Sequence, residues 1–387
     1  MRILYIVKED PRVGLGHAPE RARHFIAGFR KQGLTVTCAF PNFELPALSS
    51  KSIEKDKETL AEVNYLSLSN LRTFLERGLQ FFHSHHEKLV SRSFIRSLSD
   101  LVRQEHFDLI ICEELSSAIA AKSLKDSPKF IYVAHNVESE LYLAILQSHW
   151  LRDVRHRNLT STELDVLRKA KAVFCFSKVD RAKLERLSSR TSSSPLNSLR
   201  LTRAGCRRPE TSEPEKKPDS ILFVGALNYP PNIEALNWFS EQILPQLQSK
   251  ASIIVAGKNP TNLVRDLARQ HQFQLIESPP SMAEVLKRGI LSIVPLKNGS
   301  GTRGKILESL AHGIPVVSTS IGAEGLDLVP GRDLVIADSP AEFAAKIDGL
   351  LANDEERAKL IQAGLKAAEH FDYEKVVEDF LVQLKTL

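Results

Sequence analysis

Short apolar runs rich in β-branched residues alternate with longer segments of helical periodicity along the whole chain. Such alternation is typical of α/β proteins, in which parallel strands are joined by crossover helices. In the first half we expect strands at Arg2–Val7, Thr35–Phe40, Asn64–Leu68, Asp108–Cys112, Phe130–Ala134 and Ala172–Phe176. In the second half we expect them at Ser220–Val224, Ser252–Ala256, Gln274–Ile276, Leu291–Pro295, Pro315–Thr319 and Leu334–Ile336.

The strand and helix pattern restarts near residue 220, which predicts two doubly wound, Rossmann-like domains. A chain of 387 residues fits this division, because single cores stop growing near roughly 250–300 residues. The segment Leu187–Asp219 is rich in Ser, Pro and charge and is predicted to be an exposed linker. We therefore expect domains at 1–208 and 209–372. The amphipathic helix at 373–387 must pack on a neighbour, and the first domain is the candidate.

Composition and charge narrow the class of protein. Apolar residues make up 42% and charged residues 26% of the chain, as in soluble globular proteins. Residues 1–208 carry 34 Lys and Arg against 23 Asp and Glu, a net charge of +11, whereas the rest of the chain has a net charge of −6. Four scattered cysteines suggest neither a disulfide framework nor a zinc site. They are expected to be reduced core residues.

No apolar run approaches the roughly 20 residues of a membrane-spanning helix, and the N-terminal run is too short for a signal peptide. We therefore expect a cytoplasmic protein and leave open a peripheral position on the inner face of the cytoplasmic membrane.

The segment Ile290–Thr319 carries the clearest chemical signal. A buried strand ends at Pro295, a glycine-rich turn follows, and Thr302 is a plausible N-cap for a helix that runs to His312. Backbone N–H groups and the helix dipole then converge at one point, which favours an anion such as a diphosphate.

Arg303 and Lys305 lie where the helix dipole disfavours cations unless an anion is bound. Glu308 lies one turn further on, and its carboxylate could accept hydrogen bonds from a ribose. Taken separately, Lys305 and Glu308 could equally be a surface ion pair. The combination after a buried strand favours the phosphate site.

This segment resembles the donor-binding region of retaining family-4 glycosyltransferases, and within them the bacterial polysaccharide-biosynthesis branch. The matching stretches include 294–326, with GSGTR, PVVST and GAEGL, then 223–232 and 255–260. The resemblance covers nearly all of the second half of the chain. In the first half it rests on Gly14–Gly16, on 135–138 and on 176–180.

The resemblance implies the GT-B fold, in which two Rossmann-like domains face each other across a cleft. It also implies a nucleotide-diphosphate sugar as donor substrate, no cofactor, no metal and retention of anomeric configuration. Arg303 and Lys305 would bind the diphosphate and stabilise its charge, and His135 would reach the transferred sugar. The remaining donor-binding residues would be Gly225, Lys258, Leu275, Ile276, Gly299, Ser300, Gly301, Thr302 and Glu308.

Two departures from the family pattern concern the donor. The family carries two glutamates eight positions apart; Glu308 fits the second, but Ser300 stands at the first. Ala226 and Asn228 stand in the region of the Arg and Lys that the family places after the first strand of this domain. Arg303 and Lys305 are then the natural replacements.

The first half offers weaker candidates. Gly14 and Gly16 superficially suggest a dinucleotide fingerprint, but the third glycine is replaced by Pro19 and the ribose-binding acid is missing, which argues against a nicotinamide oxidoreductase. A glycine-rich loop facing the cleft, or a plain connection, remains. His135 follows a buried strand at the end where α/β sheets bind ligands, although it could simply cap the strand. The acceptor or cleft-loop set is Gly14, Gly16, His17, Arg21 and Glu138.

Basic residues flank two amphipathic patterns within Leu71–Val102. Core helices with solvated basic faces are the simpler explanation, and docking to an anionic membrane surface is the alternative. Nucleic acid is not an expected partner, because no binding motif accompanies the charge.

The sequence therefore predicts a glycosyltransferase whose acceptor is a glycan, a lipid-linked molecule or a small molecule. A non-catalytic nucleotide-sugar-binding protein and a GT-B nucleotide-sugar epimerase are the alternatives. Donor sugar, base, linkage and oligomeric state are not predicted.

Overall fold

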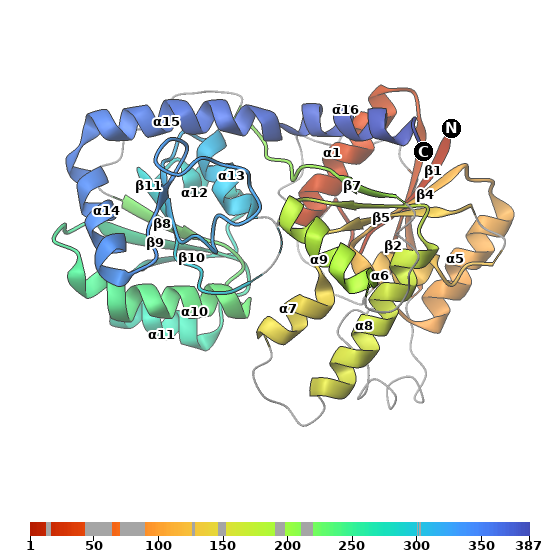
Figure 1. Ribbon diagram of the computed structural model, residues 1–387, viewed down its shortest axis with the longest axis horizontal. Coiled ribbons are helices and arrows are strands. Elements are labelled where there is room, and N and C mark those ends of the chain that lie inside the picture. Colours follow the sequence, from red (N-terminus) through yellow and green to blue (C-terminus); the bar gives the residue numbers. More distant parts are fainter. Residues whose placement is uncertain are drawn as a thin grey trace. The chain divides into compact units, whose positions relative to one another are not determined.

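The computed structural model describes residues 1–12, 17–42, 64–69, 90–125, 128–145, 152–189, 198–209, 220–299, 301 and 303–387 (Figure 1). The chain forms two compact units. Unit 1 comprises Met1–Arg203 together with Val376–Leu387, and unit 2 comprises Ala204–Lys375. Gly14, Gly16, Ser300 and Thr302 lie outside the described residues, as does all of the first amphipathic pattern, at residues 71–82.

Unit 1 contains a seven-stranded sheet in the order β3-β2-β1-β4-β5-β6-β7, and every pair is parallel. Chain order reverses between β1 and β4, which makes the carboxyl ends of these two strands a topological switch point. The strands are β1 (Arg2–Ile6), β2 (Thr35–Asn42), β3 (Asn64–Ser69), β4 (Leu109–Glu113), β5 (Phe130–Ala134), β6 (Ala172–Cys175) and β7 (Leu199–Leu201).

Alternate residues of this sheet enter two different cores, as the two-residue repeat of a strand requires. Leu4 and Ile110 face one core, which includes residues of α5 (Arg92–Gln104), α6 (Glu114–Ala121), α8 (Arg152–Lys169) and α9 (Lys178–Ser189). Tyr5 and Ile111 face the other core, which includes α1 (His17–Lys31) and α16 (Tyr373–Leu384). α7 (Glu138–Ile145) precedes α8.

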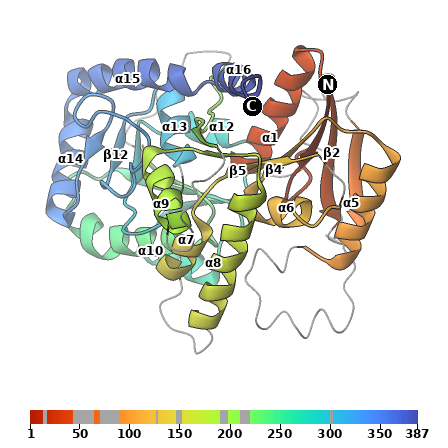
Figure 2. The same cartoon turned by 45° about the vertical axis from the view of Figure 1, so that its right-hand side comes forward.

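The last helix belongs to unit 1 from Val376 onward. The Phe380 ring lies 5.2 Å from the Phe25 ring of α1, and the two helices lie side by side in both views (Figure 1, Figure 2). A Cβ added to Gly28 would lie 2.5 Å from Val377, so this close approach requires glycine.

Unit 2 contains a six-stranded parallel sheet in the order β10-β9-β8-β11-β12-β13, with its switch point between β8 and β11. The strands are β8 (Ser220–Val224), β9 (Ser252–Gly257), β10 (Gln274–Glu277), β11 (Leu291–Val294), β12 (Val316–Ser318) and β13 (Val335–Ile336). The helices are α10 (Pro230–Trp238), the π-helix η2 (Phe239–Ile243), the 3₁₀ helix η3 (Leu244–Gln246), α11 (Asn262–Gln270), α12 (Met282–Leu286), α13 (Gly304–Ala311), α14 (Pro340–Ala352), α15 (Asp354–Ala368) and the 3₁₀ helix η4 (Glu369–Phe371).

The connection between the units differs from the predicted linker. Leu199–Leu201 pairs with β6 as edge strand β7, so part of the segment 187–219 belongs to the sheet. The chain passes into unit 2 after Arg203 rather than after residue 208. Cys206 explains the shift, because its backbone N–H donates to the Phe371 carbonyl at 2.7 Å and its side chain is buried in the core of unit 2.

Two further findings concern expectations from composition. All four cysteines lie in the described part of the chain, where they are buried, as predicted for core residues, and form no disulfide bond. In the part of the chain that the structure describes, no helix is both long enough and apolar enough to cross a membrane.

Candidate functional site

The switch point of unit 2 brings the predicted diphosphate-binding residues to the carboxyl ends of β8 and β11. Gly225 follows β8, and Pro295–Gly299 follow β11, which pairs directly with β8. Ligands in open α/β sheets bind at this kind of crevice. The strand order therefore gathers here two segments that are about 70 residues apart in sequence.

The glycine-rich loop has the backbone that its sequence suggested. Gly299 and Gly301 have φ angles of 122° and 80°, in the left-handed region that favours glycine. A Cβ on Gly299 would lie 3.1 Å from Nη2 of Arg303, so side chain and loop pack closely. The helix begins at Gly304 with Arg303 at the N-cap position, which corrects the prediction of a Thr302 cap. It ends at Ala311, with His312 at the C-cap.

Arg303 is 7% exposed, and its Nη1 donates to the Gly301 carbonyl at 2.9 Å. The guanidinium is thereby folded back against the loop at the start of α13. An arginine at an N-cap supplies no acceptor for the helix N–H groups, and the structure shows no side-chain cap bond there. The backbone N–H groups of the first turn of α13 and the Arg303 guanidinium therefore lie at the same end of the helix.

Lys305 is held in the first turn of α13 by a neighbouring element. Its Nζ donates to Asn232 Oδ1 at 2.7 Å and lies 5.6 Å from the Phe223 ring centre. Burial and the charge of Arg303 lower the pKa of Lys305 to about 7, and only Glu308 acts in the opposite direction. A desolvated amine beside a guanidinium is stabilised in its charged form by an anion, so this arrangement favours anion binding.

Asn232 is the partner that sequence reasoning missed. It is 5% exposed, and its Nδ2 donates to the Ala226 carbonyl at 2.9 Å, which fixes Oδ1 toward Lys305. Gly225 makes this arrangement possible, because a Cβ there would lie 2.8 Å from Asn232 Nδ2 and 3.0 Å from Lys305 Nζ. The signal available in the sequence was Asn232 itself, in the Pro-Pro-Asn that opens α10.

The other predicted donor-binding residues lie along the same edge of the sheet. Glu308 lies one turn after Lys305 in α13 and is half-buried. The Lys258 carbonyl accepts from Leu227 N–H at 2.9 Å, which ties the loop after β9 to the loop after β8. Leu275 and Ile276 are half-buried in β10, two strands from β8. Their predicted role in binding the base of the nucleotide stays a prediction.

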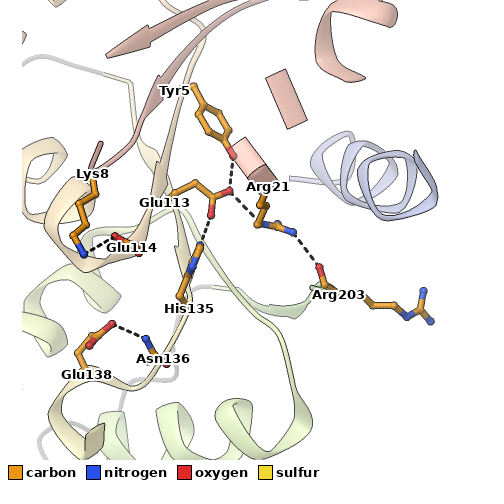
Figure 3. Close-up of polar contacts among 9 residues, drawn as sticks. All are labelled: Tyr5, Lys8, Arg21, Glu113, Glu114, His135, Asn136, Glu138 and Arg203. Atoms are coloured by element: carbon orange, nitrogen blue, oxygen red, sulfur yellow. Dashed lines mark hydrogen bonds and ion pairs between the residues drawn. The ribbon is translucent and has the colours of Figure 1, made fainter. Parts of the chain in front are cut away.

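A second polar cluster lies at the switch point of unit 1, on the carboxylate of Glu113 (Figure 3). Glu113 ends β4 opposite Val133 of β5, and His135 lies two residues beyond Val133, on the same face. His135 Nε2 lies 2.5 Å from Glu113 Oε2, and the Tyr5 hydroxyl donates to Oε1.

Arg21 completes this cluster from α1. Its Nε donates to Glu113 Oε1 at 3.3 Å, and its Nη1 donates to the Arg203 carbonyl at 3.0 Å (Figure 3). The guanidinium carbon lies 3.8 Å from the Phe25 ring centre. The side chain is 0% exposed and lies in α1 rather than in a loop, and an acceptor role for Arg21 stays a prediction.

His17 and Glu138 are also not loop residues. His17 opens α1, and Glu138 opens α7 and is 4% exposed. Asn136 Nδ2 donates to Glu138 Oε1 at 3.1 Å (Figure 3). Glu138 was predicted from the stretch 135–138 that carries the resemblance, and His17 from its place beside Gly14 and Gly16; an acceptor role for either residue stays a prediction.

Glu113 is ionised despite its burial. Burial alone would raise its pKa, but Arg21, His135 and Tyr5 lower the pKa to about 2. The next residue, Glu114, has a φ of 66°, which is strained for a residue with a side chain. Glu114 also lies 3.8 Å from Lys8, which follows β1. The Glu-Glu pair directly after a buried strand was the signal that sequence reasoning passed over.

A third buried carboxylate supports the helix that follows His135. Glu163 of α8 is 0% exposed and accepts the backbone N–H groups of Glu138 and Ser139 at 2.8 and 3.0 Å. It therefore caps α7 from outside the helix. Burial raises the pKa of Glu163 to about 7, with Glu138 adding to the increase and the Ser139 hydrogen bonds opposing it.

Comparison with known proteins settles the fold. Sucrose-phosphate synthase from Thermosynechococcus elongatus superimposes with a TM-score of 0.76 at 15% identity, over 100% of this chain and 98% of that one. Anabaena HepE in complex with UDP-glucose superimposes with a TM-score of 0.72 at 12% identity, over 100% of both chains. The chain has the GT-B fold. Both GT-B units have the doubly wound sheet predicted from the sequence.

The sequence matches are confined to part of this GT-B chain. Residues 218–353 match the family model described as glycosyl transferases group 1. An uncharacterised 44.6 kDa protein in the cps region of Klebsiella pneumoniae is 30% identical over 139 residues. That alignment covers 33% of this chain and 36% of the Klebsiella protein.

Proposed function

We propose that this protein is a metal-independent, retaining glycosyltransferase that takes its sugar from a nucleotide-diphosphate donor. The observation that carries the proposal is the pairing of Arg303 and Lys305 at the start of α13, on a glycine-rich loop at the switch point of unit 2. The family match over residues 218–353 supports the same activity.

The chemistry assigned to these residues follows from charge. As the bond between the anomeric carbon and the diphosphate breaks, the carbon becomes cationic and the diphosphate gains negative charge. Arg303, Lys305 and the N–H groups of α13 would stabilise that developing charge, and such preorganised donors are a large term in catalysis. The acceptor hydroxyl then bonds to the anomeric carbon on the same face and passes its proton to an oxygen of the departing diphosphate.

The donor is assigned to unit 2 and the acceptor to unit 1. Glu308 would bind the ribose and the segment at Leu275 and Ile276 the base, while His135 would contact the transferred sugar. The net charge of +11 in residues 1–208 favours an anionic or lipid-linked acceptor over a neutral one. The relative in a cps region points to polysaccharide biosynthesis as the setting.

A donor panel tests the activity. The protein is incubated with UDP-, GDP-, ADP- and dTDP-sugars, and released nucleoside diphosphate and sugar products are measured by chromatography and mass. We expect one donor class to release its diphosphate, and an isomerised but intact nucleotide sugar would instead identify an epimerase. Tight donor binding without either product would establish a binding protein and contradict the proposal.

A further inference from the structure

We propose that Glu113 is a positioning residue that holds the His135 ring as its Nε2–H tautomer and so presents Nδ1 as the atom available to substrate. The tautomer assignment concerns the structure alone, and its catalytic consequence rests on the proposed function. Glu113 was not among the site residues predicted from the sequence.

The acceptor role of Glu113 toward His135 is forced by its other neighbours. An ionised carboxylate can only accept hydrogen bonds. Arg21 Nε and the Tyr5 hydroxyl occupy Oε1, and Arg21 also compensates the negative charge. Oε2 therefore accepts from His135 Nε2, which must carry the proton.

The surroundings keep this pair in one arrangement. Glu113 is 3% exposed, and the His135 side chain is 10% exposed, so water offers Glu113 little competition. The Phe176 ring lies edge-on to the His135 ring, with centroids 5.0 Å apart. Within the described part of the chain, His135 Nδ1 has no hydrogen-bond partner, and in Figure 3 the Glu113 carboxylate approaches the ring only at Nε2.

The bond to Glu113 therefore fixes both the tautomer and the orientation of the His135 ring. A histidine bonded to a carboxylate through one ring nitrogen has its tautomer and ring orientation set by that bond. With Nε2–H committed to Glu113, the neutral ring offers the Nδ1 lone pair to a sugar hydroxyl. On taking up a proton at Nδ1 the ring becomes an imidazolium stabilised by Glu113.

Replacing Glu113 by Gln reverses the direction of one hydrogen bond, the bond to His135 Nε2. The single amide oxygen must face Arg21, which can only donate, so the amide NH₂ faces His135 Nε2. That nitrogen must then accept, and the ring proton moves to Nδ1. Tyr5→Phe is the matched control, because it removes the hydroxyl at Oε1 and leaves the bond to His135 intact.

The test is ¹⁵N NMR of the full-length protein labelled at histidine, with His135 assigned by its loss in His135→Gln. Spectra recorded across the imidazole titration range identify the protonated nitrogen of the neutral ring. We expect Nε2–H in the wild type and in Tyr5→Phe, and Nδ1–H in Glu113→Gln. Nδ1–H in the wild type overturns the proposal, and this reading needs no variant to fold.

The turnover of Glu113→Gln is the second test, and it addresses the positioning role. With the matched donor, Glu113→Gln is expected to lose turnover by about 10- to 100-fold with little change in donor KM, a loss usual for partners that orient a histidine. A reversed tautomer with unchanged turnover overturns the positioning role. Absence of sugar transfer by the wild type would instead be a failure of the proposed function, and the NMR result would stand apart from it.

Discussion

The pKa of Lys305, about 7 in the protein without donor, predicts that nucleoside diphosphate binding takes up a proton. A diphosphate favours the ammonium form, so binding raises the pKa of Lys305 above its value in the free protein. Below pH 7 the amine is already mostly charged, so Lys305 adds little further pH dependence to the affinity. Above pH 7 affinity falls by up to about 10-fold per pH unit, until the pKa of the bound state is reached.

The groups that face Lys305 set the size of the effect. Arg303 stays charged throughout, Asn232 and Phe223 do not titrate, and Glu308 is the acidic group among the described residues that raises the pKa of Lys305. Between pH 7 and pH 9 the protonated fraction of a group with pKa 7 falls from about 50% to about 1%, which bounds the loss of affinity over this range at about 50-fold. The diphosphate itself is fully ionised in this range, since its last proton leaves near pH 6.

Isothermal titration calorimetry with UDP at pH 7, 8 and 9 measures the dissociation constant. Repeating it in two buffers of different ionisation enthalpy measures the protons taken up. Lys305→Arg, which remains charged, should bind UDP with no pH dependence in this range, whereas Lys287→Ala, on an exposed cation of unit 2, should retain it. Equal wild-type dissociation constants at pH 7 and pH 9 would refute the reasoning.

The remaining predictions concern three other polar residues, Asn232, Glu163 and Glu308. Asn232→Asp places a carboxylate beside Lys305 Nζ and should weaken UDP binding at least 10-fold at pH 6.5, where the amine is mostly charged, because the carboxylate neutralises the ammonium; Asn237→Asp, at a half-buried position of α10 outside this contact, is the calorimetric control. Glu163, whose pKa is raised to about 7, stabilises the fold below its unfolded-state value near 4.5 and loses that contribution as pH rises through 7. The stability advantage of wild type over Glu163→Gln, measured by urea unfolding, should therefore shrink by up to about 3 kcal/mol between pH 4.5 and pH 8, and a constant difference would contradict the assignment. Glu308→Ala should weaken UDP binding through the ribose while leaving 2′,3′-dideoxy-UDP binding unchanged, and equal losses for both nucleotides would contradict a ribose contact.

The fold was largely predictable because its signal is local. Strands Phe130–Ala134 and Ser220–Val224 have the bounds read from their apolar runs. β7 was missed because Leu199–Leu201 is a short, half-buried edge strand inside a polar segment, where burial gives little pattern. The unit boundary depends on Cys206 pairing with Phe371, a contact between positions far apart in sequence that no local pattern records.

In the candidate site, too, contacts between residues close in sequence could be predicted and contacts between distant residues could not. The glycine loop, Arg303 and Lys305 form one continuous motif, so their proximity could be predicted. Asn232 and Glu113 meet their partners through strand order, and only the folded sheet brings Glu113 to His135. Arg21 looked like a surface charge because sequence does not reveal that its partner is a buried carboxylate.

The measurement that tests the central claim most directly is the rate of nucleoside diphosphate release from the matched nucleotide sugar. It is compared at saturating donor for wild type, Arg303→Ala, Lys305→Ala and the control Lys287→Ala. The account predicts that the Arg303 and Lys305 variants lose roughly 10²-fold or more in turnover with the fold intact, as when one charge-stabilising donor is removed, while Lys287→Ala matches wild type. Near-normal release by both Arg303→Ala and Lys305→Ala would contradict it.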